Sequence, residues 1–253
     1  MREKKDSSGE GMWIGGVNPV REALRSRAAH PLELVYCRGD SRLRELVDLS
    51  EARNIPARQE SREILAALLG HVHHQGVALR VSEYPYAELD EVLNRDLHER
   101  EPLIVLDSIQ DPQNLGAMMR SACFLGARGL IIPKDRSARV TATVIKVSAG
   151  AASHLPVMQV TNLARSLERL KESGLWIVGL EAEGSVPIHE VDLTVPLGLV
   201  IGNEQKGLRP LVRSHCDILA RIPSHGPVDS LNAAVAGAVA LAEVQRQRIS
   251  TRL

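Results

Sequence analysis

The chain has 253 residues, of which 44% are hydrophobic and 25% are charged, and its formal net charge is zero. A chain of this length fits a small domain joined to a medium one, because a typical domain holds about 100–200 residues. No apolar run approaches the roughly 18 residues that cross a bilayer, and a neutral chain has no overall charge to attract nucleic acid, so any such binding requires a local patch of Lys and Arg.

Residues 1–12 are polar and charged and lack an apolar segment. This pattern predicts a disordered tail and not a secretory signal, so we expect a cytoplasmic protein. Short apolar runs and amphipathic runs then alternate, which predicts helices at 17–27, 41–53 and 61–69 and strands at 32–37 and 77–81. We therefore expect a compact α/β domain over residues 13–82.

A polar, charged stretch follows at residues 83–101, and we assign it as the linker to a second domain over residues 102–253. In this second domain the apolar runs are short and continuous, which is typical of parallel strands buried on both faces. Strands are expected at 103–106, 129–132, 175–180, 197–201 and 217–222, and helices at 114–125, 162–173 and 232–245. The alternation predicts a parallel sheet with helices on both sides.

Ligands of such sheets bind at the carboxyl ends of the strands. Three of the expected strand ends are followed by loops rich in Gly, Pro and polar residues, at 107–120, 202–208 and 223–232. In the first loop Asn114 is placed to cap a helix, and Arg120 follows almost two turns later. Each loop alone is better explained as ordinary turn chemistry than as a functional site.

Metal and disulfide sites find no support in the sequence. The three cysteines lie far apart without a CxxC pair, which argues against a disulfide framework and a zinc ribbon. His71, His73 and His74 lack the neighbouring ligands of a metal site, so we expect no metal. No GxGxxG follows an expected strand, which leaves no loop for a dinucleotide cofactor.

The three loops together resemble a known family. Their sequences, DPQNLGAMMRSACFLGA, IGNEQKGL and IPSHGPVDSLNAAVAGAVALAE, resemble motifs 1, 2 and 3 of the SpoU/TrmH (SPOUT) RNA 2′-O-ribose methyltransferases. Near the start, WIGGVNPVREAL and HHQGVALRV resemble the small L30e-like RNA-binding domain of the bacterial 23S rRNA (guanosine-2′-O)-methyltransferase B group. Motif 2 departs from the family at Gln205, where members usually have Gly, so a positive φ at this position would be costly.

The resemblance implies a SPOUT fold with a deep trefoil knot, which is an exception to the rule that chains do not thread themselves. It also implies that S-adenosylmethionine donates a methyl group to a ribose 2′-hydroxyl of structured RNA, with a guanosine of 23S rRNA as the expected target. The catalytic domains are expected to form a homodimer in which the Arg-bearing segment lies near the partner's cofactor site. Carried over by motif, the cofactor-binding residues are Glu181, Ile201, Gly202, Ile222, Pro223 and Leu231.

The residues implied in catalysis are Asn114, Arg120, Glu204, Ser230 and Asn232. A guanidinium stays protonated at pH 7, so Arg120 is better suited to stabilise the alkoxide or hold an adjacent phosphate than to act as a base. Asn114 is expected to orient Arg120 or the ribose, and Glu204 to fix its loop and pair with a cation. Ser230 and Asn232 contact the substrate or cap the following helix.

Two other functions stay open at this point. A tRNA ribose 2′-O-methyltransferase shares the catalytic motifs, although such enzymes often lack a separate L30e-like domain. A non-catalytic RNA-binding factor in ribosome assembly could keep the fold, but the intact motif residues count against it.

Overall fold

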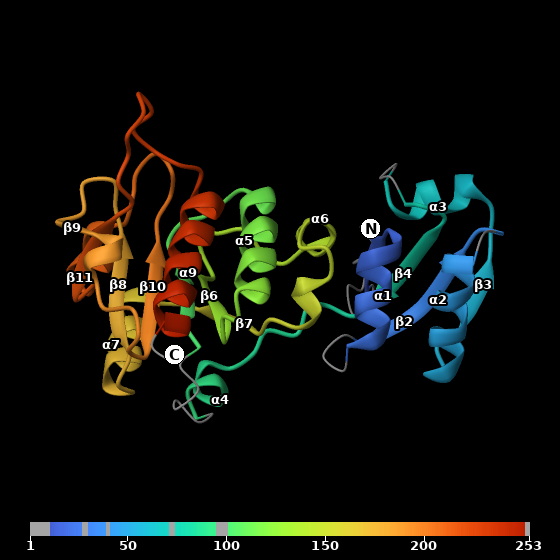
Figure 1. Ribbon diagram of the computed structural model, residues 1–253. Coiled ribbons are helices and arrows are strands. Elements are labelled where there is room, and N and C mark those ends of the chain that lie inside the picture. The colour runs from blue at the N-terminus through green and yellow to red at the C-terminus, as the bar shows by residue number, and fades with distance from the viewer. Residues whose placement is uncertain (1–10, 27–29, 39–40, 71–73, 95–100, 251–253) are drawn as a thin grey trace, which may run out of the picture. The chain divides into compact units, whose positions relative to one another are not determined.

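The computed structural model describes residues 11–26, 30–38, 41–70, 74–94 and 101–250. Most of the expected tail, as well as His71 and His73, lies outside these ranges. The chain divides into two compact units, the first formed by residues 1–85 and 140–154 and the second by residues 86–139 and 155–253 (Figure 1). Within the described ranges, no helix combines the length and the apolar character needed to span a membrane.

The first unit has a four-stranded sheet in the order β1-β4-β2-β3, in which β1 and β2 run antiparallel to β4, and β3 is parallel to β2. All five elements expected between residues 13 and 82 are present. Helix α3 begins where the Ser61 hydroxyl accepts a hydrogen bond from the Ile64 amide. The elements are β1 (Met12–Gly15), α1 (Val17–Arg25), β2 (Pro31–Tyr36), α2 (Ser41–Ala52), β3 (Ala57–Gln59), α3 (Arg62–Leu68) and β4 (Val77–Val81).

A segment from the middle of the chain, residues 140–154, completes the first unit. It contains α6 (Ala142–Val147), which packs on β1, and a 3₁₀ turn, η1 (Ala151–Ser153). The Ser26 hydroxyl donates to the Ser153 carbonyl at 2.6 Å, and His154 Nε2 lies 2.8 Å from Glu22 Oε2. The segment lies within the range predicted for the second domain, but its contacts belong to the first unit.

The second unit is built on a seven-stranded sheet in the order β7-β6-β5-β10-β8-β11-β9, and every neighbouring pair is parallel. The expectation of an α/β fold with a parallel sheet is confirmed. The strands are β5 (Leu103–Leu106), β6 (Gly129–Pro133), β7 (Val157–Val160), β8 (Trp176–Leu180), β9 (Val186–Pro187), β10 (Leu197–Ile201) and β11 (Ile218–Arg221). The helical elements are α4 (Leu89–Leu93), α5 (Pro112–Phe124), α7 (Leu163–Glu172), η2 (Ile188–Glu190), α8 (Pro210–Ser214) and α9 (Ala233–Ser250).

Helices cover both faces of this sheet. On one face α5 and α9 lie side by side in front of the strands (Figure 1), and a Cβ on Gly237 of α9 would come within 3.0 Å of Met118 and Ile201. On the other face, side chains of α4, α7 and α8 share a core with alternate residues of β5. Helix α4 lies inside the stretch that the sequence analysis assigned as a linker, and Leu89 and Val92 bury it in this core.

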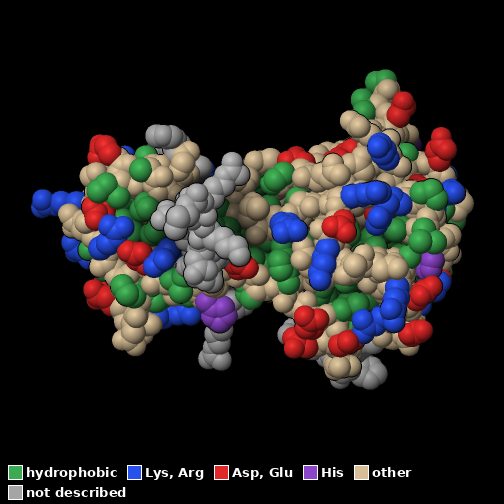
Figure 2. Space-filling view, turned by 180° about the vertical axis from the view of Figure 1, so that it is seen from behind, with side chains coloured by type: hydrophobic (Ala, Val, Ile, Leu, Met, Phe, Trp, Pro, Cys, Tyr) green, Lys and Arg blue, Asp and Glu red, His purple; other side chains and the backbone are tan. Residues whose placement is uncertain are grey.

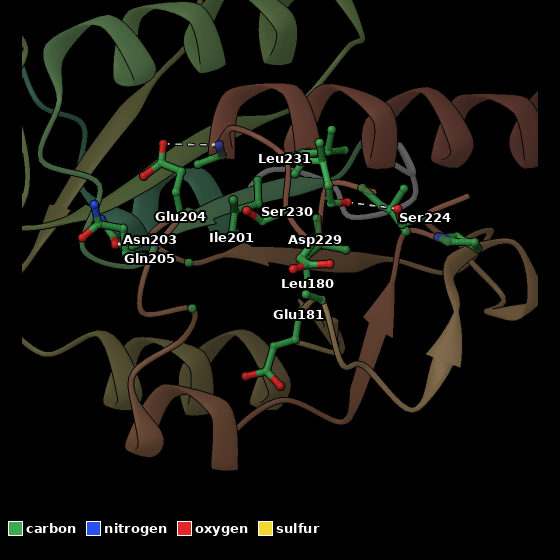
Figure 3. A pocket seen from close by; sticks show the side chains of 18 of the residues that line it. Leu180, Glu181, Ile201, Asn203, Glu204, Gln205, Ser224, Asp229, Ser230 and Leu231 are labelled. Atoms are coloured by element: carbon green, nitrogen blue, oxygen red, sulfur yellow. Dashed lines mark hydrogen bonds between the residues drawn. The ribbon is translucent and has the colours of Figure 1, made fainter. Parts of the chain in front are cut away.

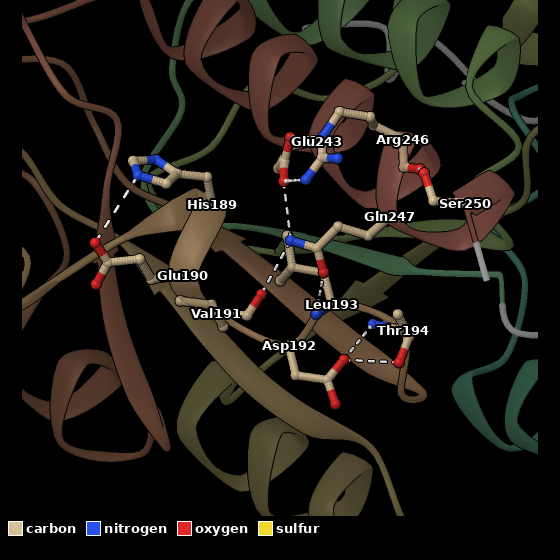
Figure 4. Close-up of polar contacts among 10 residues, drawn as sticks. All are labelled: His189, Glu190, Val191, Asp192, Leu193, Thr194, Glu243, Arg246, Gln247 and Ser250. Carbon is tan, nitrogen blue, oxygen red and sulfur yellow. Dashed lines mark hydrogen bonds and ion pairs between the residues drawn. The ribbon is translucent and has the colours of Figure 1, made fainter.

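The carboxyl-terminal half of α9 is fixed to the segment that leads into β10. Gln247 accepts a hydrogen bond from the Leu193 amide at 2.9 Å and donates to the Val191 carbonyl at 3.0 Å (Figure 4). The buried Arg248 donates to the carbonyls of Leu193 and Val195, at 2.9 and 2.8 Å. These contacts orient α9, whose first turn lines a cavity at the carboxyl ends of β8, β10 and β11.

Candidate functional site

A cavity of about 430 Å³ lies at the carboxyl ends of β8, β10 and β11 (Figure 3). Its wall combines residues from the ends of these strands with the loops that follow β10 and β11 and with the first turn of α9. All six residues that the sequence analysis assigned to the cofactor line this cavity: Glu181, Ile201, Gly202, Ile222, Pro223 and Leu231. Its volume is in the range of pockets that bind small molecules and cofactors.

The charged side chains of the cavity wall are all acidic. Glu181, Glu204 and Asp229 line it, whereas none of the described lining residues is Lys, Arg or His. Glu181 also pairs with Arg213 at 2.9 Å, which offsets one of the negative charges. Such a wall favours a ligand that carries a positive charge.

The loop between β10 and α8 folds back on itself as a tight hairpin. Asn203 and Gly207 exchange backbone hydrogen bonds of 3.1 and 2.8 Å, and the Asn203 side chain accepts from the Gln205 and Lys206 amides. The positive φ that this turn requires is at Gly207, which has φ of +62°. The prediction of a strained backbone conformation at Gln205 is therefore wrong, because Gln205 is not among the residues with positive φ.

Gly202 directly follows β10, and the far end of the loop folds back against it. A Cβ built there would lie 2.4 Å from the Gly207 carbonyl carbon and 2.7 Å from the Leu208 nitrogen. The contacting atoms are backbone and cannot swing aside as a side chain could. Gly202 therefore permits the close approach that gives the cavity its floor.

An ion pair that was not predicted from the sequence, between the buried Asp107 and the partly exposed Arg209, holds the same loop. Asp107, at the end of β5, is fully buried and receives hydrogen bonds from the Arg209 backbone amide at 2.8 Å and from Arg209 Nε at 2.6 Å. The Asp107 amide donates to the Ile201 carbonyl at 2.8 Å. One residue thus fixes both ends of the loop at 202–208.

Glu204 connects the three sequence motifs. Its Oε1 accepts hydrogen bonds from the Asn114 side-chain amide and from Asn232 Nδ2 at 3.4 Å. It also accepts one from the Ala233 backbone amide at 3.3 Å (Figure 3). The cation expected beside Glu204 is not found in the described part of the chain. Its charge is instead stabilised by amide donors at the amino-terminal end of α9, where the helix dipole favours an anion.

Asn114 does not cap α5, contrary to expectation. The helix begins two residues earlier at Pro112, and Asp111 is its cap, with its carboxylate accepting from the Gln113 amide at 2.9 Å. This position frees the Asn114 side chain, whose Oδ1 accepts from Asn232 Nδ2 at 2.7 Å. Asn114 is therefore fixed by the other two motifs.

The remaining catalytic candidates differ in their surroundings. Asn232 caps α9 through the Ala234 and Val235 amides, so it combines a capping role with its contact to Asn114. Ser230 lines the cavity. Arg120 is exposed on α5, does not line the cavity, and has no ion pair or side-chain hydrogen bond to any described residue.

Two of the three cysteines are poor nucleophiles. Burial raises the pKa of the Cys216 thiol to about 12, and burial also raises the pKa of Cys37. A thiol with such a pKa is almost entirely protonated at pH 7. Within the described residues there is no group of three His, Cys, Asp or Glu side chains that could hold a metal ion.

Comparisons with protein families match both units. A model described as the SpoU rRNA Methylase family matches residues 101–242, and a model described as RNA 2′-O ribose methyltransferase substrate binding matches residues 13–87. The chain is 43% identical to the 23S rRNA (guanosine-2′-O-)-methyltransferase RlmB of Xylella fastidiosa, over 93% of this chain and 96% of that protein. It is also 43% identical to an uncharacterized tRNA/rRNA methyltransferase of Mycolicibacterium smegmatis, over 93% of this chain and 76% of that one.

Solved structures are similar over nearly the whole chain. The SpoU methyltransferase AviRb from Streptomyces viridochromogenes, in complex with AdoMet, is 28% identical with a TM-score of 0.82, covering 98% of this chain and 95% of that one. An AdoMet-bound rRNA methyltransferase from Sinorhizobium meliloti is 25% identical with a TM-score of 0.80, covering 94% and 87%. A TrmH/SpoU tRNA modifying enzyme from A. aeolicus is 28% identical with a TM-score of 0.56 and covers only 64% of this chain and 81% of that one.

Proposed function

We infer the function of this protein from the premise that the chain belongs to the SpoU family of rRNA methylases. It is an S-adenosylmethionine-dependent enzyme that methylates a ribose 2′-hydroxyl of RNA. We propose that the methylated residue is a guanosine of 23S rRNA, because the similarity to the RlmB proteins extends over both units of the chain. The tRNA-modifying enzyme, by contrast, matches about two thirds of it.

The observation that carries the proposal is the acidic cavity at the carboxyl ends of β8, β10 and β11. Its wall fits S-adenosylmethionine in size, and its three carboxylates suit a ligand with a positively charged sulfur. When bound, this cofactor supplies an electrophilic methyl group. The backbone around Gly202, Ile222 and Leu231 would hold the adenosine, since main-chain donors and acceptors at strand ends suit the edge of a base.

Residues of the chain then prepare the attacking hydroxyl. Glu204 holds Asn114 and Asn232 together at the rim of the cavity, where their amides can orient the ribose. We propose that Arg120 stabilises the negative charge that develops on the 2′-oxygen or holds the adjacent phosphate. Ser230 is proposed to bind the substrate, because it lines the cavity and does not cap α9.

Arg120 does not line the cavity of its own chain, so we propose that it serves the cavity of a second copy. The exposed face of α5 carries Arg120 and, four residues later, Phe124, which is 87% exposed and is the chain's only phenylalanine. Helix α9, beside α5, exposes Val235 and Val239 at the same spacing. These apolar side chains fit a homodimer interface through the second unit, in which each copy completes the other's site.

The trefoil knot implied by the family resemblance stays a prediction. The same is true of the boundaries expected for the linker and for the two domains. Since rRNA is made and assembled in the bacterial cytoplasm, we propose that the enzyme acts there.

A transfer assay tests the function. The protein is incubated with methyl-labelled S-adenosylmethionine and, separately, with 23S rRNA, 16S rRNA and tRNA that lack modifications. We expect label in 23S rRNA, and nuclease digestion should yield it as 2′-O-methylguanosine. Label in tRNA alone would favour the tRNA alternative, and no transfer to any RNA or ribosomal precursor would favour a non-catalytic assembly factor.

A further inference from the structure

Positive charge is distributed unevenly over the second unit. On the face shown in Figure 2, Lys and Arg side chains are interleaved with Asp and Glu, in keeping with the net charge of zero. At the amino edge of the sheet, exposed cations have carboxylate partners, as in Lys171 with Asp217 at 2.6 Å and Arg246 with Glu243 at 2.7 Å. Among the described residues, little unneutralised positive charge therefore remains at that edge.

The carboxyl edge is different. Apart from Arg120, every described and exposed Lys or Arg of this unit that lacks both an ion pair and a side-chain hydrogen bond follows the carboxyl end of a strand. Three of these cations come directly after β6, namely Lys134, Arg136 and Arg139, and only Asp135 interrupts their charge. The others are Arg165, which follows β7, and Lys206, which follows β10.

The strand order separates the cations that follow β6 and β7 from the acidic cavity, whereas Lys206 lies in the loop after β10. Strands β6 and β7 are at one end of the sheet, whereas β8 and β11, whose loops carry Glu181, Glu183 and Asp229, are toward the other. Neighbouring strands are about 4.8 Å apart, so β6 lies roughly 10 Å from β10 and its cofactor loop. The carboxyl edge of the sheet thus has a basic half and an acidic half. Both halves are close enough to contact one bound nucleotide and its neighbours in the RNA.

The loop after β6 is held firmly beside motif 1. The Ala138 amide donates to the Ile109 carbonyl at 2.8 Å, and the Ser137 hydroxyl donates to the same oxygen at 3.2 Å. The Lys134 amide donates to the Val160 carbonyl at the end of β7 at 2.8 Å, and the Ala138 side chain is buried. The backbone is therefore fixed, while the three cationic side chains extend into solvent.

We propose that Lys134, Arg136 and Arg139 form a phosphate-binding surface for the RNA strand that flanks the target nucleotide, which rests on the proposed function. Exposed Lys and Arg side chains bind phosphates by charge-assisted hydrogen bonds and release counterions. The carboxylates of the cavity repel the same phosphates. Attraction on one side and repulsion on the other direct the backbone over β6 and leave the ribose at the rim of the cavity.

The test compares the variant Lys134→Gln/Arg136→Gln/Arg139→Gln with the unchanged full-length protein. The Kd for transcribed 23S rRNA is measured without cofactor over a range of salt concentrations, and the Kd for S-adenosylmethionine is measured by calorimetry. Arg246→Gln is the matched control, because it removes an exposed positive charge at the opposite edge of the sheet. A thermal melt verifies that all variants are folded.

We expect the Kd for RNA to rise by at least about tenfold in the triple variant, and the slope of log K against log salt to fall by about 2 to 3. The Kd for S-adenosylmethionine and kcat at saturating RNA should stay within about twofold, and Arg246→Gln should behave like the unchanged protein. An unaltered salt slope, an equal loss in Arg246→Gln, or a weaker Kd for S-adenosylmethionine would each overturn the proposal. Because RNA binding is measured without turnover, the result remains decisive even if the transfer assay fails.

Discussion

Gly202 shows how one residue type can decide whether the cavity exists. A single methyl group at this position would meet the backbone of Gly207 and Leu208, so the loop would have to move away from β10. Gly226 lines the same cavity, but a Cβ there meets no atom within 4 Å. The two glycines therefore form a matched pair for mutation.

We predict that Gly202→Ala weakens S-adenosylmethionine binding by about 100-fold, because the displaced loop no longer forms the cavity floor. Gly226→Ala should change the Kd by less than about twofold, since nothing opposes the added methyl group. Calorimetric titration of both variants measures the difference. Equal affinities would show that the cofactor binds elsewhere.

Arg120 does not line the cavity, and we propose that it acts in the chemical step. We predict that Arg120→Ala lowers kcat by about 10²- to 10³-fold, the usual effect of removing one group that stabilises a developing oxyanion. The Kd for S-adenosylmethionine should hardly change, and Arg120→Lys should recover part of the rate because it keeps the charge. A parallel loss of cofactor affinity in Arg120→Ala would contradict this assignment.

The site residues differ in how far the sequence could predict them. Ile201, Gly202, Ile222 and Pro223 were assigned from the resemblance to the family motifs, and they are at or next to the ends of apolar runs, where parallel sheets bind ligands. The Asp107–Arg209 pair could not be found in this way. Its partners are 102 residues apart, and they meet only because β5 and β10 are neighbours in the sheet.

Helix α9 depends on the buried Arg248 for its attachment. We predict that Arg248→Ala lowers the free energy of unfolding by about 3 kcal/mol, because two charge-assisted hydrogen bonds to backbone carbonyls are lost and a buried volume is left empty. Arg246→Ala on the exposed side of the helix should leave the denaturation midpoint almost unchanged. Urea denaturation of the two variants tests this contrast, and similar midpoints would show that α9 does not need this attachment.

Helices α7 and α8 are linked by His215. The pKa of His215 is raised by the Leu211 carbonyl, 2.7 Å from Nδ1, and by Glu168, 3.0 Å from Nε2, against the opposing effects of burial and Lys171. Both partners are acceptors, and only the imidazolium can donate to both at once. The link is therefore complete when the ring is protonated.

We predict that the stability difference between the unchanged protein and His215→Gln is largest below about pH 6.5, the pKa of an unfolded histidine, and disappears as the pH rises through the raised pKa of the folded state. The effect should be small, since Glu168 is mostly exposed. Chemical denaturation at a series of pH values measures it. A difference that grows toward alkaline pH would have the wrong sign for this interaction.

Element prediction succeeded where a short run of residues was continuously apolar or a longer run showed a helical period. The five expected strands of the second domain became β5, β6, β8, β10 and β11, and the helix expected at 162–173 became α7. The shortest elements escaped, including the half-polar β7 and the two-residue β9. Tertiary contacts stabilise such short elements more than the intrinsic propensities of their residues do, as the burial of Leu89 and Val92 in α4 illustrates.

For the molecule as a whole, the proposed exchange of Arg120 between subunits makes a quantitative prediction. In a pure homodimer, Arg120→Ala and, at a low S-adenosylmethionine concentration, Gly202→Ala should each nearly abolish activity. In a mixed dimer, however, the Arg120 of one chain can serve the intact cavity of the other. A random mixture should regain about one quarter of normal activity, since half of the dimers are mixed and each of these has one working site of two.

The two variants can be produced together with different affinity tags, and the mixed species isolated and assayed. The control is a dimer whose two differently tagged chains both carry Arg120→Ala, and it should stay inactive. If the mixed species were as inactive as its parents, Arg120 would act within its own chain or the protein would not be a dimer.

The packing of residues 140–154 in the first unit has a consequence for synthesis on the ribosome. Domains usually fold from the amino terminus as they emerge. Here β1 and α1 meet their last packing partners, α6 and the turn at Ala151–Ser153, only after β5 and β6, two of the second unit's seven strands, have been translated. The nascent amino-terminal unit must therefore wait with an uncovered apolar face, and a gene fragment that ends near residue 85 would encode a protein that keeps this face exposed permanently.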